Sequence, residues 1–182
     1  MVSSIWAVVM GFIGPFYVVQ VQKLSGGMEK LGIAFGIMVF LRSLSTYFAG
    51  HFSDRLGRRP FLIGVAYADA VILIGYTLIQ DHLQLYLLQG LLGLTNGVSG
   101  TIQVALLADF TTQAKRGRNI GKFHAIVGLA SAAGLFLGGY LAEAFGVEFL
   151  FYLASALVAL SATLLFFMKE EALKKEGHEI PN

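Results

Sequence analysis

The sequence predicts an all-α integral membrane protein of six transmembrane helices, arranged as two inverted repeats of three helices each. Composition is the first reason. Of the 182 residues, 56% are hydrophobic and 13% are charged, and the mean hydropathy is +0.71. A soluble domain of this composition would expose large apolar patches, so the bilayer is the better solvent. The other two reasons are the division of the chain into apolar runs and the placement of its basic residues.

Six apolar runs each approach the ~20 residues that a helix needs to cross a ~30 Å hydrocarbon core. Backbone groups in lipid must satisfy their own hydrogen bonds, so runs of this length indicate helices and not barrel strands. The predicted spans are residues 5–22, 31–52, 60–79, 83–107, 120–142 and 147–168. They form one bundle over residues 1–168, and a polar tail follows at 169–182.

The first span contains Gly14-Pro15. Proline has no N–H and clashes with the preceding turn, so a bend is expected near the middle of the membrane. Tyr17 follows this bend and is a candidate to reach a central cavity. The run lacks a basic segment before it, so it is expected to stay as a membrane anchor and not to be cleaved as a signal peptide.

The second and third spans each contain one charge near mid-membrane. Arg42 lies ten residues before the end of its span and Asp69 about nine residues into the next, so both are ~14 Å from the cytoplasmic side. An isolated charge at this depth costs about 3 kcal/mol on insertion scales, which favours a pair. Two interpretations are open: a coupling site in which Asp69 takes a proton as Arg42 turns to solute, or a buried structural pair.

The fourth span carries a stripe of polar and small residues. Gln89, Asn96 and Gln103 recur every seven residues, with Gly93 and Gly100 between them, so all five share one helical face. Amides facing lipid would be unfavourable, so this face is expected to meet protein or a water-filled cavity. The amides either contact solute or join helices by hydrogen bonds.

The fifth span has a surface of small residues, which allows close helix packing. Its members are Gly128, Ala132, Ala133, Gly134, Gly138 and Gly139. The sixth span follows Gly146 and is apolar up to the basic tail.

Basic residues cluster after the second, fourth and sixth spans. They are Arg55, Arg58, Arg59, Lys115, Arg116, Arg118, Lys169, Lys174 and Lys175. The opposite side has only Lys23 and Lys30. By the positive-inside rule, both termini are expected in the cytoplasm and the protein in the cell (inner) membrane. The bases follow this topology, so no nucleic-acid partner is predicted.

The connector between the second and third spans carries a specific motif. Gly50, Asp54, Gly57, Arg58 and Arg59 match G-x-x-x-D-x-x-G-R-R, which resembles the signature loop of the major facilitator superfamily of secondary transporters. The stretch from Ala108-Asp109 to Arg118 resembles the second cytoplasmic loop of that family. Gly121, Gly134 and Gly138 fall on its antiporter motif, although Ala130 and Leu135 replace a glycine and the proline.

The resemblance implies roles for these residues. The signature loop would act as a cytoplasmic latch, in which Asp54 lies against the N-terminus of a fifth helix in the opposite half. Arg58 or Arg59 would meet Asp109 of its own protomer. The alternative is that these charges only set the topology. In the family the first and fourth helices line the cavity, so Tyr17, Gln89, Asn96 and Gln103 are predicted solute contacts, together with Arg42.

Members of this family usually have twelve spans, and this chain has six. We therefore expect a complete six-helix unit that works as a homodimer, each protomer supplying one wall of the cavity. The fifth helix would meet the partner's second helix. The alternatives are a fragment of a twelve-helix transporter and a non-transporting membrane scaffold or lipid-binding unit.

The predicted function is secondary active transport of a small solute by rocker-switch alternating access. A largely apolar cavity with amides favours efflux of drug-like compounds, and a small anion drawn to Arg42 is the second choice. A proton is a candidate coupling ion, although the departures at Ala130 and Leu135 weaken proton antiport. Phosphate-binding loops, zinc-protease motifs and nucleophile elbows are absent from the sequence, so we predict no enzyme activity, cofactor or metal site.

Overall fold

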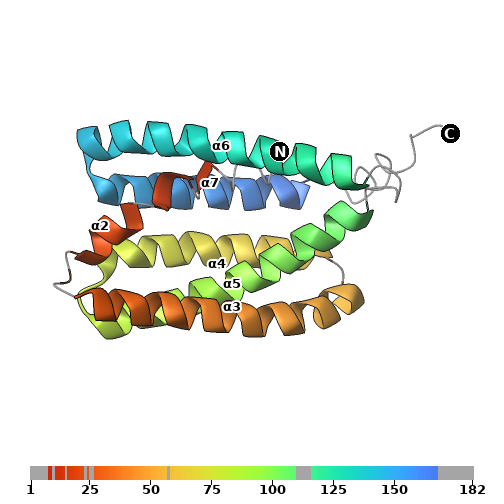
Figure 1. Cartoon of the computed structure of the whole chain (residues 1–182), viewed down its shortest axis with the longest axis horizontal. Helices are drawn as coiled ribbons and strands as arrows, with labels where there is room; N and C mark the ends of the chain where they lie inside the picture. Colours follow the sequence, from red (N-terminus) through yellow and green to blue (C-terminus); the bar gives the residue numbers. More distant parts are fainter. Residues whose placement is uncertain are drawn as a thin grey trace.

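The computed structural model describes the backbone of residues 8–9, 11–14, 16–22, 24, 27–56, 58–109 and 116–167. It describes their side chains except at 20–21, 52–56, 58, 106–109 and 116. The described chain is a bundle of helices that run along one common direction, with α5 crossing it obliquely (Figure 1). The helices are α2 (Phe16–Gln22), α3 (Met28–Leu56), α4 (Arg58–Leu78), α5 (His82–Asp109), α6 (Arg116–Phe145) and α7 (Val147–Phe167).

Four of these helices are long and apolar enough to cross a membrane: α3, α4, α6 and α7. At 28 residues α5 is also long enough, and its amides and hydroxyls lower its mean hydropathy. The first predicted span appears as helical residues 11–13, a turn at Gly14 and then α2. The expected interruption therefore falls at Gly14, and Pro15 lies outside the described residues.

The helix boundaries follow local chemistry. At the start of α5, the Asp81 carboxylate accepts from the Gln84 backbone N–H at 2.8 Å. The Gln84 side chain in turn accepts from the N–H of Gln80 at 2.8 Å, so two donors that lack helical partners are satisfied reciprocally. Between α6 and α7, Gly146 adopts a φ of 86°, a left-handed conformation that residues with a side chain rarely adopt.

The connector between α3 and α4 is shorter than the sequence predicted. Residues 53–56 continue α3, and α4 begins at Arg58. No glycine or proline interrupts the chain between Gly50 and Gly57, so the helix can extend past the membrane boundary. Pro60 is the third residue of α4, in the first turn, where the missing N–H leaves no hydrogen bond broken.

Close packing joins helices that are not consecutive in the sequence. The most extensive pairs are α3 with α5 and α4 with α7, whereas α3 and α4 touch at few positions. Glycines allow the first of these contacts. A Cβ on Gly93 would lie 2.4 Å from the Met38 carbonyl oxygen, and one on Gly97 would lie 2.5 Å from that of Arg42. The two backbones are therefore in direct contact.

A second glycine contact joins the N-terminal segment to α6. A Cβ on Gly134 would lie 2.4 Å from the Val8 carbonyl oxygen, and one on Gly11 would lie 2.3 Å from that of Ser131. Gly138 is less tightly packed, since a Cβ there would lie 3.0 Å from the Phe16 ring and 3.4 Å from the Phe12 Cα. Part of the small-residue surface of α6, which we expected to meet a partner, is thus used within the chain. A Cβ on Gly128 or Gly139 would meet nothing within 4 Å.

The core lies between α4, α5, α7 and the N-terminal segment. Its largest fully buried side chains include Tyr76, Phe151, Leu73 and Leu85. The Ser155 hydroxyl on α7 donates to the Ala70 carbonyl on α4 at 2.8 Å, which ties this pair together at mid-membrane. By contrast, only 11% of the most apolar windows of α3 and α6 is buried inside the chain.

Candidate functional site

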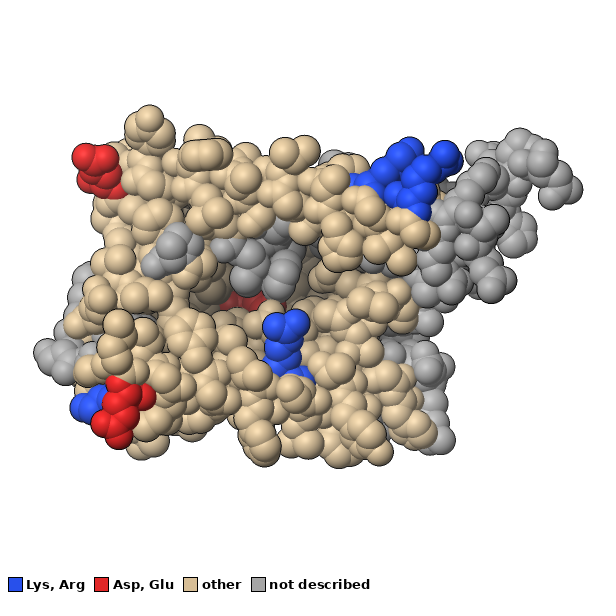
Figure 2. Space-filling view, viewed as in Figure 1, with Lys and Arg blue, Asp and Glu red and all other residues tan. Residues whose placement is uncertain are grey.

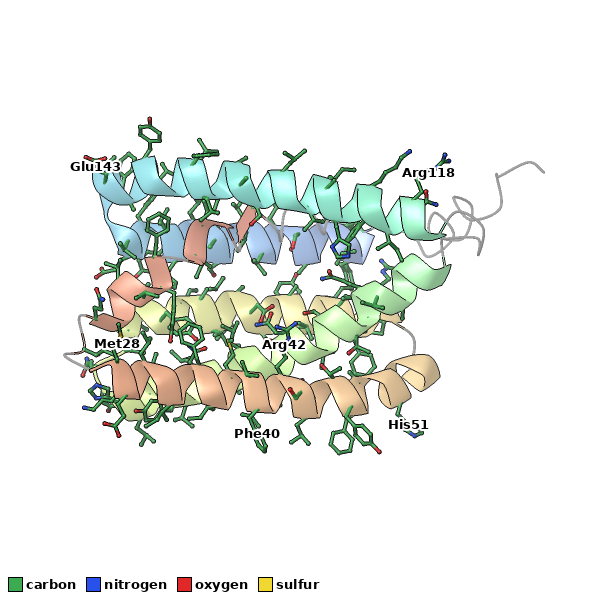
Figure 3. All side chains as sticks on the ribbon, viewed as in Figure 1. Met28, Phe40, Arg42, His51, Arg118 and Glu143 are labelled. Carbon is green, nitrogen blue, oxygen red and sulfur yellow. The ribbon has the colours of Figure 1, made fainter. Side chains whose placement is uncertain are left out.

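A cavity of about 420 Å³ opens between α2, α3, α4 and α5. Most of its lining is apolar, and the polar residues include Tyr17, Arg42, Gln89, Asn96, Ser99 and Gln103. The structure therefore brings all five predicted solute contacts, one from α2, one from α3 and three from α5, to a single cavity. Figure 2 shows a hollow in the middle of this face, with a basic side chain at its edge where Figure 3 labels Arg42.

The cavity has three levels along the bundle axis. Gly93 meets Met38 and Gly97 meets Arg42, so the chains of α3 and α5 run in the same direction where they cross. Arg42 therefore lies at the same depth as Asn96. Gln89 and Gln103 are each seven residues from Asn96, which is two helical turns or about 10 Å on either side. The stripe of amides on α5 therefore spans the length of the cavity.

An aromatic cluster forms the level near the start of α3. The rings of Tyr17 and Phe35 meet edge to face, with centroids 5.6 Å apart, and those of Tyr17 and Tyr76 do the same at 5.4 Å. Gln89 is only 1% exposed, and its amide nitrogen donates to the Tyr17 hydroxyl. The other amide atom, Oε1, has no hydrogen-bond partner within the described part of the chain.

Arg42 lies at the midpoint of α3, with fourteen helical residues on each side. Its side chain points toward the neighbouring helices, whereas Phe40 leaves the opposite side of α3 (Figure 3). Arg42 is exposed to the cavity, and its guanidinium makes no hydrogen bond to any residue whose position the structure describes. A charge at this depth is unfavourable by about 3 kcal/mol unless it is solvated or paired, so a cavity is a suitable environment.

Asp69 is also at mid-membrane, but it does not line the cavity. It is 1% exposed on α4, one and two turns before Leu73 and Tyr76, which do line the cavity. No hydrogen bond joins the Asp69 carboxylate to Arg42 within the described residues, and the pairing that equal depth suggested stays a prediction. The helix α3 lies mainly against α5 and makes few contacts with its sequence neighbour α4.

The residues of the predicted latch are only partly described. Gly50 is half-buried, and a Cβ there would lie 3.9 Å from the Thr101 side chain of α5. The side chains of Asp54, Arg58 and Asp109, and Gly57 as a whole, lie outside the described residues.

Arg59 has a partner that the sequence did not suggest. Its Nε and Nη2 donate to the Leu165 carbonyl oxygen at 3.0 and 2.8 Å, and Nη2 also donates to that of Phe166 at 2.6 Å. These carbonyls end α7, where backbone acceptors lack helical partners and the helix dipole is negative. In this conformation Arg59 caps α7.

The sequence profile described as Major Facilitator Superfamily matches residues 1–181. The chain belongs to this superfamily. The resemblance carried by the loop after α3 thus extends over nearly the whole sequence, and the family is one of membrane transporters.

Relatives within the superfamily differ in length. The chain is 33% identical over 151 residues to the uncharacterized transporter YitZ of Bacillus subtilis, covering 83% of this chain and 92% of YitZ. It is 22% identical to the uncharacterized transporter MJ1560 of Methanocaldococcus jannaschii, covering 93% of this chain and 44% of the relative. It is 27% identical to the multi-drug resistance efflux pump PmrA of Streptococcus pneumoniae, covering 86% and 40%. The chain thus spans less than half of the last two.

The aromatic lining of the cavity was not predicted from the sequence. Phe35 and Tyr76 line it, and neither was among the predicted solute contacts. An aromatic residue on an apolar helix has the same pattern in lipid, core or cavity. The usable signal was the position of Tyr76, two turns after Asp69 and therefore on the same face of α4.

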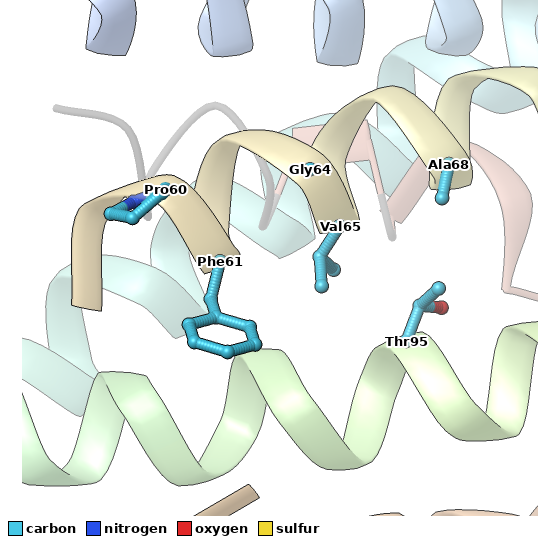
Figure 4. A pocket seen from close by; sticks show the side chains of 6 residues that line it. All are labelled: Pro60, Phe61, Gly64, Val65, Ala68 and Thr95. Atoms are coloured by element: carbon cyan, nitrogen blue, oxygen red, sulfur yellow. The ribbon is translucent and has the colours of Figure 1, made fainter. Parts of the chain in front are cut away.

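A second cavity, of about 490 Å³, lies between α4 and α5 in the half of α4 next to the basic connector. Its lining is almost entirely apolar: Pro60, Phe61, Gly64, Val65, Ala68 and Thr95 (Figure 4). It shares no lining residue with the first cavity. None of the predicted functional residues lines it.

Proposed function

We propose that the protein is a secondary active transporter that moves a small solute across the cell membrane by rocker-switch alternating access. The cavity described above is the observation that carries the proposal. It lies at mid-membrane and is lined by Tyr17, Arg42, Gln89, Asn96 and Gln103, which supply donors, acceptors and one charge within apolar walls. Sites of this kind, mostly apolar with few polar groups, suit small organic solutes.

The active unit is proposed to be a homodimer, in which two copies face each other and enclose the cavity. The near-complete coverage of YitZ supports a functional unit of this length. The alternative, half of a twelve-helix transporter, is supported by the 44% and 40% coverage of MJ1560 and PmrA. In that case the same cavity would form one wall of a longer protein's site.

The exposed apolar faces of α3 and α6 support a contact between copies. Phe40 and Tyr47 on α3 are 69% and 79% exposed, and Leu129 and Phe136 on α6 are 74% and 75% exposed. We propose that α3 of one copy packs beside α6 of the other, next to the cavity.

The helix contacts also support two inverted three-helix repeats. In such repeats the first and fourth helices correspond, as do the second and fifth. The pair of α3 with α5 then corresponds to the pair of α6 with the N-terminal helix. Both pairs are joined by glycines whose missing side chains let backbones touch.

For the solute, we favour drug-like compounds moved outward. PmrA is named a multi-drug resistance efflux pump, and MdtG of Dickeya zeae, 27% identical over 165 residues, a multidrug resistance protein. For coupling, we propose that Asp69 takes up a proton while Arg42 faces the solute. Both termini are proposed to be cytoplasmic. The basic Arg118 and His51 lie at one end of the bundle, and Glu143 and Met28 lie at the other (Figure 3).

A flux measurement in proteoliposomes tests the transport proposal. The purified protein should move at least one member of a panel of cationic, neutral and anionic aromatic compounds along an imposed proton gradient. Asn96→Leu should reduce this flux at least tenfold, because it removes an amide from the middle of the cavity. Val71→Ala on α4, where the side chain is 69% exposed and lies outside both the cavity and the proposed contact between copies, is the control and should retain flux.

The predicted cytoplasmic latch can be tested separately. Asp54→Asn should reduce flux while leaving the protein folded, because the neutral side chain no longer favours a helix N-terminus. Folded, membrane-inserted protein that moves no member of the panel under any gradient would contradict transport and favour a scaffold or lipid-binding role.

A further inference from the structure

We infer that the solute is an amphipathic organic anion, held with its acidic group at Arg42 and its apolar body against Tyr17, Phe35 and Tyr76. The inference rests on the proposed function, because it takes the cavity to be the solute site. It narrows the drug-like class to one sign of charge.

Charge is the first argument. Among the described lining residues, Arg42 is the one charged side chain, and it faces the cavity without a hydrogen bond inside the described chain. Asp69 is 1% exposed and is not among the residues that line the cavity. A guanidinium in apolar surroundings selects carboxylates, sulfonates and phosphates, which it can bind through two parallel N–H donors.

Spacing is the second argument. Arg42 is level with Asn96, and the aromatic cluster is level with Gln89, two turns or about 10 Å away. An ion smaller than this distance would reach Arg42 and leave the aromatic level empty. A solute with an aromatic or other apolar body joined to an acidic group fits both levels together.

The third argument is a buried hydrogen-bond acceptor that has no donor in the described part of the chain. Gln89 is 1% exposed and lines the cavity, and its Oε1 has no hydrogen-bond partner among the described residues. A buried acceptor left in this state is unfavourable. If the Gln89 side chain turns toward the cavity, an N–H or O–H donor on the solute would satisfy it, so we expect the solute to carry such a donor on its apolar body.

If two copies enclose the cavity, symmetry brings a second Arg42 to the same depth. Two guanidinium groups in one low-dielectric space repel each other, and an anion between them removes that repulsion. The dimer would therefore strengthen the selection against cations.

Equilibrium dialysis of the protein in lipid nanodiscs tests the inference with two matched compounds. Indole-3-acetate has an aromatic ring, an N–H donor and a carboxylate, and tryptamine has the same ring and donor with an ammonium group. We expect indole-3-acetate to bind at least tenfold more tightly than tryptamine, after subtraction of binding to empty nanodiscs.

Variants assign the preference to Arg42. Arg42→Gln should weaken indole-3-acetate binding at least tenfold, and Arg42→Lys should weaken it less, because the charge remains but the planar pair of donors is lost. Lys122→Gln removes an exposed charge from α6 and should change neither affinity. The comparison of the two compounds on the unaltered protein needs no variant to fold.

The outcomes separate this inference from the transport proposal. Preference for tryptamine, equal binding, or binding of neither compound at millimolar concentration would overturn the inference. So would unchanged indole-3-acetate affinity in folded Arg42→Gln. Flux of cations without anion binding would leave transport standing and remove the inference. Anion binding with no flux of any compound would support the anion site and contradict the transport proposal.

Discussion

Two glycines of α5, Gly93 and Gly97, determine how closely α5 approaches α3. A Cβ at either position would overlap a backbone carbonyl oxygen of α3 at about the level of Arg42. The same contact sets the levels of the cavity, because it places Arg42 beside Asn96. Packing and function are thus linked at these residues.

Gly93→Ala should destabilise the protein by about 1–3 kcal/mol, because the added methyl forces α3 and α5 apart. Gly36→Ala on the exposed side of α3 meets nothing within 4 Å and should be neutral or stabilising by up to about 1 kcal/mol through helix propensity. Reversible unfolding in mixed detergent micelles measures both. Equal effects of the two substitutions would show that the contact is not as close as described.

Tyr17 and Gln89 form a buried hydrogen bond between α2 and α5. Tyr17→Phe leaves the Gln89 amide nitrogen unsatisfied, so it should lower the free energy of unfolding by about 1–3 kcal/mol. The double variant with Gln89→Leu should lose less than the sum of the single losses, because both remove one interaction. Tyr140→Phe on the outer face of α6, 77% exposed, is the control and should change little. Strict additivity would argue against the bond.

Among the individual residues, the polar half of the cavity could be predicted from the sequence and the aromatic half could not. Gln89, Asn96 and Gln103 repeat every seven residues in an apolar helix, and amides there must face away from lipid. Phe35 and Tyr76 carry no such requirement, because aromatic side chains are stable in lipid, core or cavity alike. The partner of Arg59 was missed for another reason: the sequence does not indicate which helix end lies beside it.

Among the helices, α7 depends on a residue from another element. The three hydrogen bonds from Arg59 occupy carbonyls in its last turn, so the first turn of α4 holds the end of α7. Since α4 and α7 also form one of the two most extensive contacts in the bundle, they are expected to move as a unit. The sequence predicted both helices and their approximate bounds, but their pairing requires the three-dimensional order of the helices.

Arg59→Gln should speed hydrogen exchange in the last turn of α7 and destabilise the protein by about 1–2 kcal/mol, because it removes charge-assisted hydrogen bonds and a favourable charge at the helix C-terminus. Lys122→Gln, which removes an exposed charge from α6, should leave that exchange unchanged. Mass-spectrometric hydrogen exchange on the intact protein gives the comparison. No change at α7 would mean that Arg59 acts elsewhere, for example at Asp109.

For the whole molecule, the apolar runs predicted a helical membrane bundle, and the comparisons confirmed the superfamily. The order of packing was predicted less well. The expected pairing of Arg42 with Asp69 assumed that helices consecutive in sequence are neighbours along their length. The bundle instead makes its most extensive contacts between α3 and α5 and between α4 and α7.

The central claim is that two copies of this chain enclose one solute cavity. The most direct measurement is the mass of the protein, purified in mild detergent and reconstituted in lipid nanodiscs, by native mass spectrometry. The account predicts a particle of twice the 19.7 kDa chain, after subtraction of bound lipid and detergent. A stable single chain of 19.7 kDa in both environments, with no larger species, would contradict it.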